Sequence, residues 1–109
     1  MTLDDLGKDI TMSVQHTVVF RLRHTRDSAE EADFLDAARR ILAQIAGVEN
    51  FAVSRQVSAK SDLDWQFSMR FADQSAYDGY DSHPDHVAFV AERWVPEVAA
   101  FQEFDFVAR

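Results

Sequence analysis

Apolar and polar residues alternate along four stretches of the chain, and this pattern predicts four β-strands. The predicted strands cover residues 14–23, 48–57, 63–71 and 101–107. Their apolar faces carry Val14, His16, Val18, Phe20 and Leu22 in the first, Phe51, Val53 and Val57 in the second, Leu63, Trp65, Phe67, Met69 and Phe71 in the third, and Phe104 and Phe106 in the fourth. A single histidine, His16, therefore interrupts the apolar face of the first strand.

Between the first two strands, an apolar stripe with helical spacing predicts an α-helix. The stripe consists of Phe34, Ala38, Ile41, Leu42 and Ile45. Ser28 followed by Glu31 matches a capping box at the start of this helix. Gly47 is suited to the left-handed position that follows a helix, so we expect the helix to end there.

Two shorter helices are expected between the third and fourth strands. Asp73 is a good N-cap for a short helix over residues 74–82. Pro84 cannot lie inside that helix but suits the first position of a second one, so the chain should break near His83. Val87, Val90, Trp94 and Val98, with Val95 beside them, form the apolar stripe of the second helix. Pro96 implies a kink or an early end of that helix.

The order β-α-β-β-α-β predicts an α+β, ferredoxin-like fold, with four antiparallel strands and both helices on one face of the sheet. On the other face, Thr17, Val19 and Val107 mix with polar neighbours. A homodimer that packs sheet against sheet would cover this face.

Composition narrows the function classes. The chain has 109 residues, 47% of them apolar, which fits one domain over 13–109 after a flexible extension over 1–12. The net charge of −8 argues against nucleic-acid binding. No apolar run approaches the ~20 residues that span a bilayer, and the acidic N-terminus lacks the apolar core of a signal peptide, so we expect no membrane association and a cytoplasmic protein.

The sequence offers no cofactor site, so none is expected. It has no cysteine and only three glycines, which excludes thiolate metal sites and glycine-rich phosphate loops. His83 and His86 are spaced to face the same way on a helix, but zinc needs further ligands, and no spacing supplies them. We therefore predict no metal site.

The densest polar and aromatic cluster runs from Tyr77 to His86. A neutral imidazole can take a proton, and a phenol can donate a hydrogen bond to a developing oxyanion, so Tyr80 and His86 could perform proton transfer. Alternatively, this segment is only a helix start, with His83 as the cap and the tyrosines packed. His16 is either a core histidine bonded to a backbone carbonyl or a tyrosine, or a polar group lining a pocket. Because burying an unpaired imidazole is costly, a partner is required in both cases.

The chain resembles the dimeric stress-responsive α/β-barrel domain family over about residues 15–107. The segments that carry the resemblance are QHTVVFRLR, IAGVENFAVSR, DWQFSMRFAD, YDSHPDHVAFVAERWVPEV and FQEFDFV. The resemblance implies ferredoxin-like subunits whose sheets meet as a barrel in a homodimer. One family member, olivetolic acid cyclase, closes a linear polyketide thioester by aldol condensation without a cofactor. Its proton-transfer pair falls on Tyr80 and His86, and its first-strand histidine on His16; where it has a further pocket histidine, this chain has Trp65.

Two functions remain open. The first is a homodimer that binds a small apolar or acyl ligand between sheet and helices. The residues expected to contact the ligand are Phe20, Trp65, Phe67, His83, Val87 and Phe89. The second is a cofactor-independent, cyclase-like or lyase-like enzyme, with His86 as base, Tyr80 as hydrogen-bond donor and His16 positioning the substrate. In a third possibility, the protein's own aromatic side chains fill the pocket.

Overall fold

The computed structural model describes residues 12–109. The predicted N-terminal extension over 1–12 therefore lies, except for Met12, outside the described residues. No helix among residues 12–109 is long and apolar enough to cross a membrane.

Four antiparallel strands form one sheet in the order β2-β3-β1-β4. The strands are β1 (Val14–Leu22), β2 (Glu49–Arg55), β3 (Trp65–Phe71) and β4 (Val98–Phe106). The first strand is one of the two central strands and pairs with both β3 and β4. The predicted α+β, ferredoxin-like fold is confirmed.

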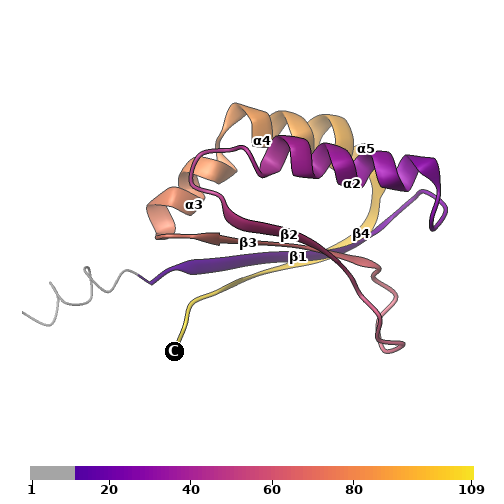
Figure 1. Ribbon diagram of the computed structural model, residues 1–109, viewed down its shortest axis with the longest axis horizontal. Helices are drawn as coiled ribbons and strands as arrows, with labels where there is room; N and C mark the ends of the chain where they lie inside the picture. The colour runs from indigo at the N-terminus through magenta and orange to yellow at the C-terminus, as the bar shows by residue number, and fades with distance from the viewer. Residues whose placement is uncertain (1–11) are drawn as a thin grey trace, which may run out of the picture.

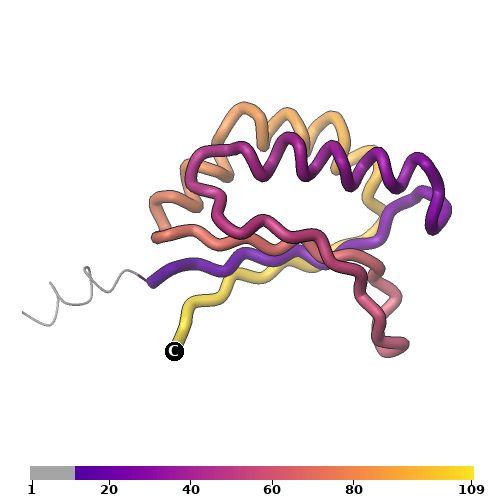
Figure 2. The backbone as a smooth tube through the Cα atoms, in the orientation of Figure 1, coloured from indigo at the N-terminus to yellow at the C-terminus, as the bar shows by residue number. Residues whose placement is uncertain are grey.

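The helices form a single layer on one face of the sheet (Figure 1). This layer comprises α2 (Ala29–Leu42), α3 (Gln74–Asp81), α4 (Pro84–Phe89), the π-helical turn η1 (Val90–Trp94) and the single turn α5 (Val95–Glu97). Figure 2 shows that the connection between β2 and β3 extends away from the helices, beyond the other face of the sheet. Among residues 12–109, no helix covers that other face.

The core lies between the sheet and the helix layer. Phe20 of β1, Phe67 of β3 and Phe34 of α2 are almost fully buried and form its centre. The ring centroids of Phe20 and Phe67 are 4.6 Å apart, and those of Phe20 and Phe34 are 5.9 Å apart, both in edge-on arrangements. Such aromatic contacts add to the burial free energy of the rings and hold α2 on the middle of the sheet.

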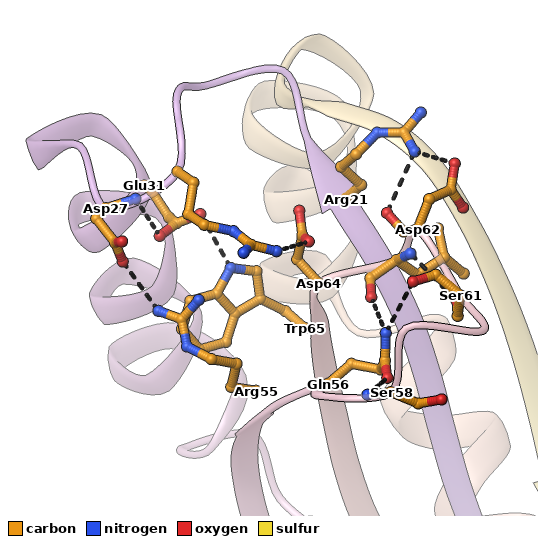
Figure 3. Close-up of polar contacts among 12 residues, drawn as sticks. Arg21, Asp27, Glu31, Arg55, Gln56, Ser58, Ser61, Asp62, Asp64 and Trp65 are labelled. Carbon is orange, nitrogen blue, oxygen red and sulfur yellow. Dashed lines mark hydrogen bonds and ion pairs between the residues drawn. The ribbon is translucent and has the colours of Figure 1, made fainter.

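Only one of the two hydrogen bonds of the predicted capping box forms at the start of α2. Ser28 accepts a hydrogen bond from the Glu31 backbone N–H, as expected (3.2 Å). The Ser28 N–H, however, already donates to the Thr25 carbonyl, so the Glu31 carboxylate accepts from the Asp27 N–H instead. Its other oxygen accepts from the Trp65 indole at 3.0 Å, and the Arg55 guanidinium lies over the indole ring (Figure 3). The buried Glu31 thereby joins α2 to the β2–β3 hairpin.

The end of α2 is also earlier than predicted. The helix ends at Leu42, and the next residues form turns in which the Ile45 and Val48 N–H groups bond carbonyls three residues back. These tighter turns bring Ile45 into the core. Gly47 does adopt the left-handed conformation expected of it, with φ of 93°, but it closes this turn rather than the helix.

The segment after β3 begins as predicted. Asp73 caps α3 by accepting from the Ala76 N–H at 2.8 Å. His83 then caps α4 by accepting from the Asp85 N–H at 3.0 Å, with Pro84 in the first helical position.

The predicted apolar stripe of the following helix is only partly confirmed, because the helix is not a continuous α-helix. Val90 is partly buried and Trp94 packs against the core, as predicted, but the other members of the stripe depart from it. Pro96 has no N–H and its ring would clash with the carbonyl four residues before it in an α-helix. The chain widens instead into η1, where the Val95 N–H bonds the carbonyl of Val90, five residues back. The extra residue rotates the helix face, so Phe89 is buried while Val87 and Val95 are exposed. Val98 belongs to β4, not to the helix.

The second strand is likewise shorter than predicted. It ends at Arg55, and Val57, placed on its apolar face by the sequence pattern, is 87% exposed in the loop that follows.

Glu97 fastens the junction between α5 and β4 to the rest of the fold. Its carboxylate accepts hydrogen bonds from His24 Nε2 at 2.7 Å and from Arg93 Nε at 2.5 Å. Arg93 also bonds Asp33 of α2. Burial on its own would raise the pKa of Glu97, but the hydrogen bonds and charges of Arg93 and His24 outweigh burial and hold this pKa below its ordinary value.

A carboxyl group whose pKa is lowered by folding stabilises the protein above its unfolded pKa and loses that contribution as pH falls through the folded pKa. We expect Glu97→Gln to lower the free energy of unfolding by about 1–3 kcal/mol at neutral pH. The difference from wild type should shrink below about pH 4.5. Urea unfolding across this pH range tests the prediction, with Glu92→Gln, an exposed residue of η1, as the control. An equal loss at every pH would contradict it.

Candidate functional site

A cavity of about 340 Å³ lies between the sheet and the α3–α4–η1 side of the helix layer. Most of its wall is apolar and consists of Val18, Leu42, Phe67, Met69, Phe89, Val90, Trp94, Val95 and Phe101. Its polar groups are His16, Tyr80, Asp81, His86 and Glu103. The cavity therefore combines an apolar body with a small set of hydrogen-bonding and titratable groups.

His16 is held by the last strand. The register between β1 and β4 places it opposite Asp105, and its Nδ1 lies 2.6 Å from the Asp105 carboxylate. The Tyr77 hydroxyl lies 3.2 Å from the same nitrogen. The predicted need for a partner is thus met, in part by a tyrosine as expected. Because a carboxylate only accepts hydrogen bonds, Nδ1 carries the proton, and in the neutral ring Nε2 remains as an acceptor.

A backbone carbonyl orients the His86 ring, as the Asp105 carboxylate orients His16. Its Nδ1 lies 2.9 Å from the backbone carbonyl of Asp81. A carbonyl can only accept, so Nδ1 is again the protonated nitrogen and Nε2 of the neutral ring carries the free lone pair. The break between α3 and α4 at His83 brings this carbonyl within reach, because the chain reverses there.

The Tyr80 ring packs against His86, with ring centroids 4.5 Å apart. Tyr80 is only 2% exposed, yet its hydroxyl has no hydrogen-bond partner within residues 12–109. No fully buried polar side-chain atom in that range lacks a partner, so this hydroxyl must reach the cavity rather than the packed core. It is available to donate a hydrogen bond to a molecule bound there.

Both tyrosines of the site remain phenols near neutral pH. Burial, followed by the charges of Asp81 and Glu103, raises the pKa of Tyr80 well above its ordinary value. Burial and the neighbouring Asp105 raise the pKa of Tyr77 in the same way. Tyr80 can therefore serve as a hydrogen-bond donor but not as a base.

The predicted site residues divide into two groups. His16, Tyr80 and His86 come together at the cavity, with Phe67 and Phe89 in its apolar wall. The other four predicted contacts do not line it. Phe20 lies beneath the wall in the core, His83 caps α4, Val87 is on the outer side of α4, and Trp65 packs between Arg55 and the first turn of α2.

Several residues of the site were not predicted from the sequence. They are Tyr77, Trp94, Phe101, Glu103 and Asp105. The last three alternate with Phe104 and Phe106 along β4, so they lie on its other face. The prediction that Phe104 and Phe106 form the apolar face of this strand was wrong in that both are exposed on the open face of the sheet, and the more acidic face points toward the helices. The pairing of Asp105 with His16 could not be foreseen, because it depends on the strand register.

Among residues 12–109, no group of three or more histidine, aspartate or glutamate side chains is arranged to hold a metal ion. The polar groups of the cavity suit hydrogen bonding and proton transfer.

The family model for the stress responsive A/B barrel domain (Dabb) matches residues 14–108. The chain belongs to this family. A Dabb protein of Mesorhizobium loti with a ferredoxin-like fold is 52% identical, with a TM-score of 0.90 over 91% of this chain and 99% of that one. No curated protein matches the chain.

Two more distant structures share the fold of this Dabb chain. A dimeric ferredoxin-like protein of unknown function from Thermobifida fusca is 22% identical, with a TM-score of 0.75 over 90% of this chain and 92% of that one. A hydroxynitrile lyase from Passiflora edulis is 10% identical, with a TM-score of 0.78 over 90% and 94%. At these identities the likeness shows the fold alone.

The hydrogen bonds of the histidines predict their tautomers. In the neutral state His16 and His86 should carry the proton on Nδ1, whereas His24, whose Nε2 contacts Glu97, should carry it on Nε2. Long-range ¹H–¹⁵N spectra above about pH 8, where an unperturbed histidine is neutral, distinguish the two forms. His24 serves as the internal control. An Nε2-protonated His86 would contradict the geometry of the site.

Proposed function

We propose that this Dabb protein is a homodimer that binds a small, largely apolar molecule with a carbonyl group in the cavity between sheet and helices. The observation that carries the proposal is the Tyr80 hydroxyl, which reaches the cavity and has no hydrogen-bond partner among residues 12–109. A ligand oxygen in the cavity would accept its hydrogen bond.

The size and lining of the cavity support this proposal. Small-molecule sites usually have volumes of about 300–1,000 Å³, with mostly apolar walls and a few placed polar groups. The cavity, at about 340 Å³, lies at the lower end of that range. Its polar groups gather where α3 meets α4 and β1 meets β4, so a bound carbonyl would face Tyr80 while its apolar portion lies against Phe67 and Phe89.

The open face of the sheet supports a homodimer. Phe104 and Phe106 of the edge strand β4 stack on this face and are 44% and 54% exposed. Large aromatic side chains on an uncovered sheet face favour association with a second sheet. The structurally similar Thermobifida fusca protein is described as dimeric.

A second candidate is proton-transfer catalysis at the same site. It is favoured by the contact of Tyr80 with His86, whose Nε2 carries a free lone pair in the neutral ring. His86 would take a proton from the carbon next to the ligand carbonyl. The electron pair of that C–H bond would form the carbon–carbon double bond of the enolate, and the π pair of the carbonyl would move to its oxygen. Tyr80 would donate a hydrogen bond to the resulting enolate oxygen. Attack of the enolate carbon on a second carbonyl would give a cyclase-like reaction, with His86 returning its proton to the new alkoxide.

Binding and proton transfer can be measured together with 2-octanone in D₂O. Wild type should bind the ketone saturably, and Tyr80→Phe should weaken binding about 2–13-fold by removing one hydrogen bond. If the second candidate is correct, wild type also catalyses deuterium exchange next to the carbonyl, and His86→Gln abolishes exchange while retaining binding. NMR of the ketone reports both quantities.

Val87→Ala, on the outer side of α4, is the matched control and should change neither quantity. Absence of binding by wild type would overturn the proposed function. Binding without exchange would leave a binding protein and reject the catalytic candidate.

If the open sheet face is the dimer interface, a charge introduced on that face should weaken the dimer, and the same charge introduced elsewhere should not. Phe104→Glu should shift the protein from dimer to monomer, because a carboxylate would have to be desolvated against the partner sheet. Val87→Glu, on the helix layer, adds the same charge to an equally exposed apolar position and should leave the dimer intact. Light scattering coupled to gel filtration measures the mass. A monomeric wild type, or equal effects of the two variants, would reject this interface.

A further inference from the structure

Two carboxylates stand at the wall of the cavity. Glu103 belongs to β4 and lies opposite Val18 of β1, and Asp81 is the last residue of α3. Both side chains line the cavity and both are exposed. Neither forms an ion pair within residues 12–109, so their charges are not neutralised by a neighbouring lysine or arginine of that part of the chain.

The rest of the wall, as far as residues 12–109 form it, offers no opposing charge. None of the lysines or arginines in that part of the chain lines the cavity. Arg93 of η1 is paired with Glu97 and Asp33. Among the described residues that line the cavity, only His16 and His86 could become cationic, and His16 is already bonded to Asp105.

The same carboxylates act on the Tyr80 hydroxyl, which reaches the cavity. Burial raises the pKa of Tyr80 most, and the charges of Asp81 and Glu103 raise it further. A ligand anion in contact with this hydroxyl would meet the same repulsion from the two carboxylates.

We propose that these carboxylates make the cavity selective by charge, so that it excludes anions and its ligand is a neutral carbonyl compound such as a ketone, aldehyde or ester. This inference rests on the proposed function, because it specifies the ligand class of the same cavity. A carboxylic acid of equal length would bring a negative charge beside Asp81 and Glu103 in a partly desolvated site, where repulsion is stronger than in water. The reaction that supplies the ligand must then release a carbonyl compound that is not a free acid.

Three probes of the same chain length separate charge from other effects. These are 2-octanone, octanoate and octylammonium, measured by calorimetry near pH 8 and low ionic strength. Octanoate and octylammonium are both charged and both lose hydration on binding. A difference in their affinities therefore reports the sign of the charge that the carboxylates favour. We expect 2-octanone and octylammonium each to bind at least about tenfold more tightly than octanoate.

The isosteric variant Asp81→Asn/Glu103→Gln should bring octanoate to within about threefold of 2-octanone. The control variant Glu30→Gln/Asp36→Asn, on the exposed side of α2, changes the net charge equally and should retain the full discrimination. Added salt should narrow the gap in wild type, since exposed charges are screened.

The outcomes separate this inference from the proposed function. If no probe binds, the ligand-binding proposal fails and the selectivity fails with it. If 2-octanone binds but octanoate binds equally well, or octanoate and octylammonium are equally weak, ligand binding stands and charge selection is rejected. Charge selection by Asp81 and Glu103 is also rejected if the control variant loses the difference between 2-octanone and octanoate as much as the cavity variant does.

Discussion

The pairing of β1 with β4 is the interaction on which the site depends. The first strand of the described chain lies in the middle of the sheet, and the last one is added to it as an edge. Their antiparallel register sets His16 opposite Asp105 and Val18 opposite Glu103. A shift of one residue would turn every side chain of β4 to the other face, removing Glu103 from the cavity and Asp105 from His16, and turning Phe104 and Phe106 toward the helices. The register between β1 and β4 therefore determines both which polar groups of β4 reach the site and which apolar side chains cover the open face.

The helix layer contributes Tyr80 and His86 to the site, and a break in the helix between them determines how they are placed. A continuous helix after β3 would carry Tyr80 and His86 on a straight surface. Pro84 and the cap formed by His83 reverse the chain instead, so that the Asp81 carbonyl orients His86 while Tyr80 packs beside its ring. Pro96 then forces the widened turn η1, which places Trp94 in the cavity wall, where its ring contacts Phe20 and Phe101. Two prolines thus shape a cavity that neither one lines.

Periodicity in the sequence predicted the strands and the fold, and it placed His16 on the face that lines the cavity. Tyr80 and His86 were predicted from the polar and aromatic cluster between residues 77 and 86 and from the family resemblance. Periodicity could assign a residue to a face but not to a position along that face. Phe20 and Trp65 face the helices as expected, yet Phe20 lies beneath the wall and Trp65 is occupied by Glu31 and Arg55. Val87 and Val95 were misassigned because a 3.6-residue period does not hold across a π-helical turn. The partnership of Asp105 with His16 joins residues 89 positions apart, and only the folded register creates it.

The acidic residues of β4 also affect how the protein behaves at high concentration. An edge strand presents unpaired backbone groups to which another chain can add, and this addition is a common route to aggregation. Charged side chains that point toward the protein interior make such an addition unfavourable, because the incoming strand would bury them. Glu103 and Asp105 occupy this position on β4, while the edge strand β2 is interrupted by a register shift next to Asn50, whose φ is 54°. Both free edges of the sheet thus carry a feature that discourages uncontrolled growth of the sheet.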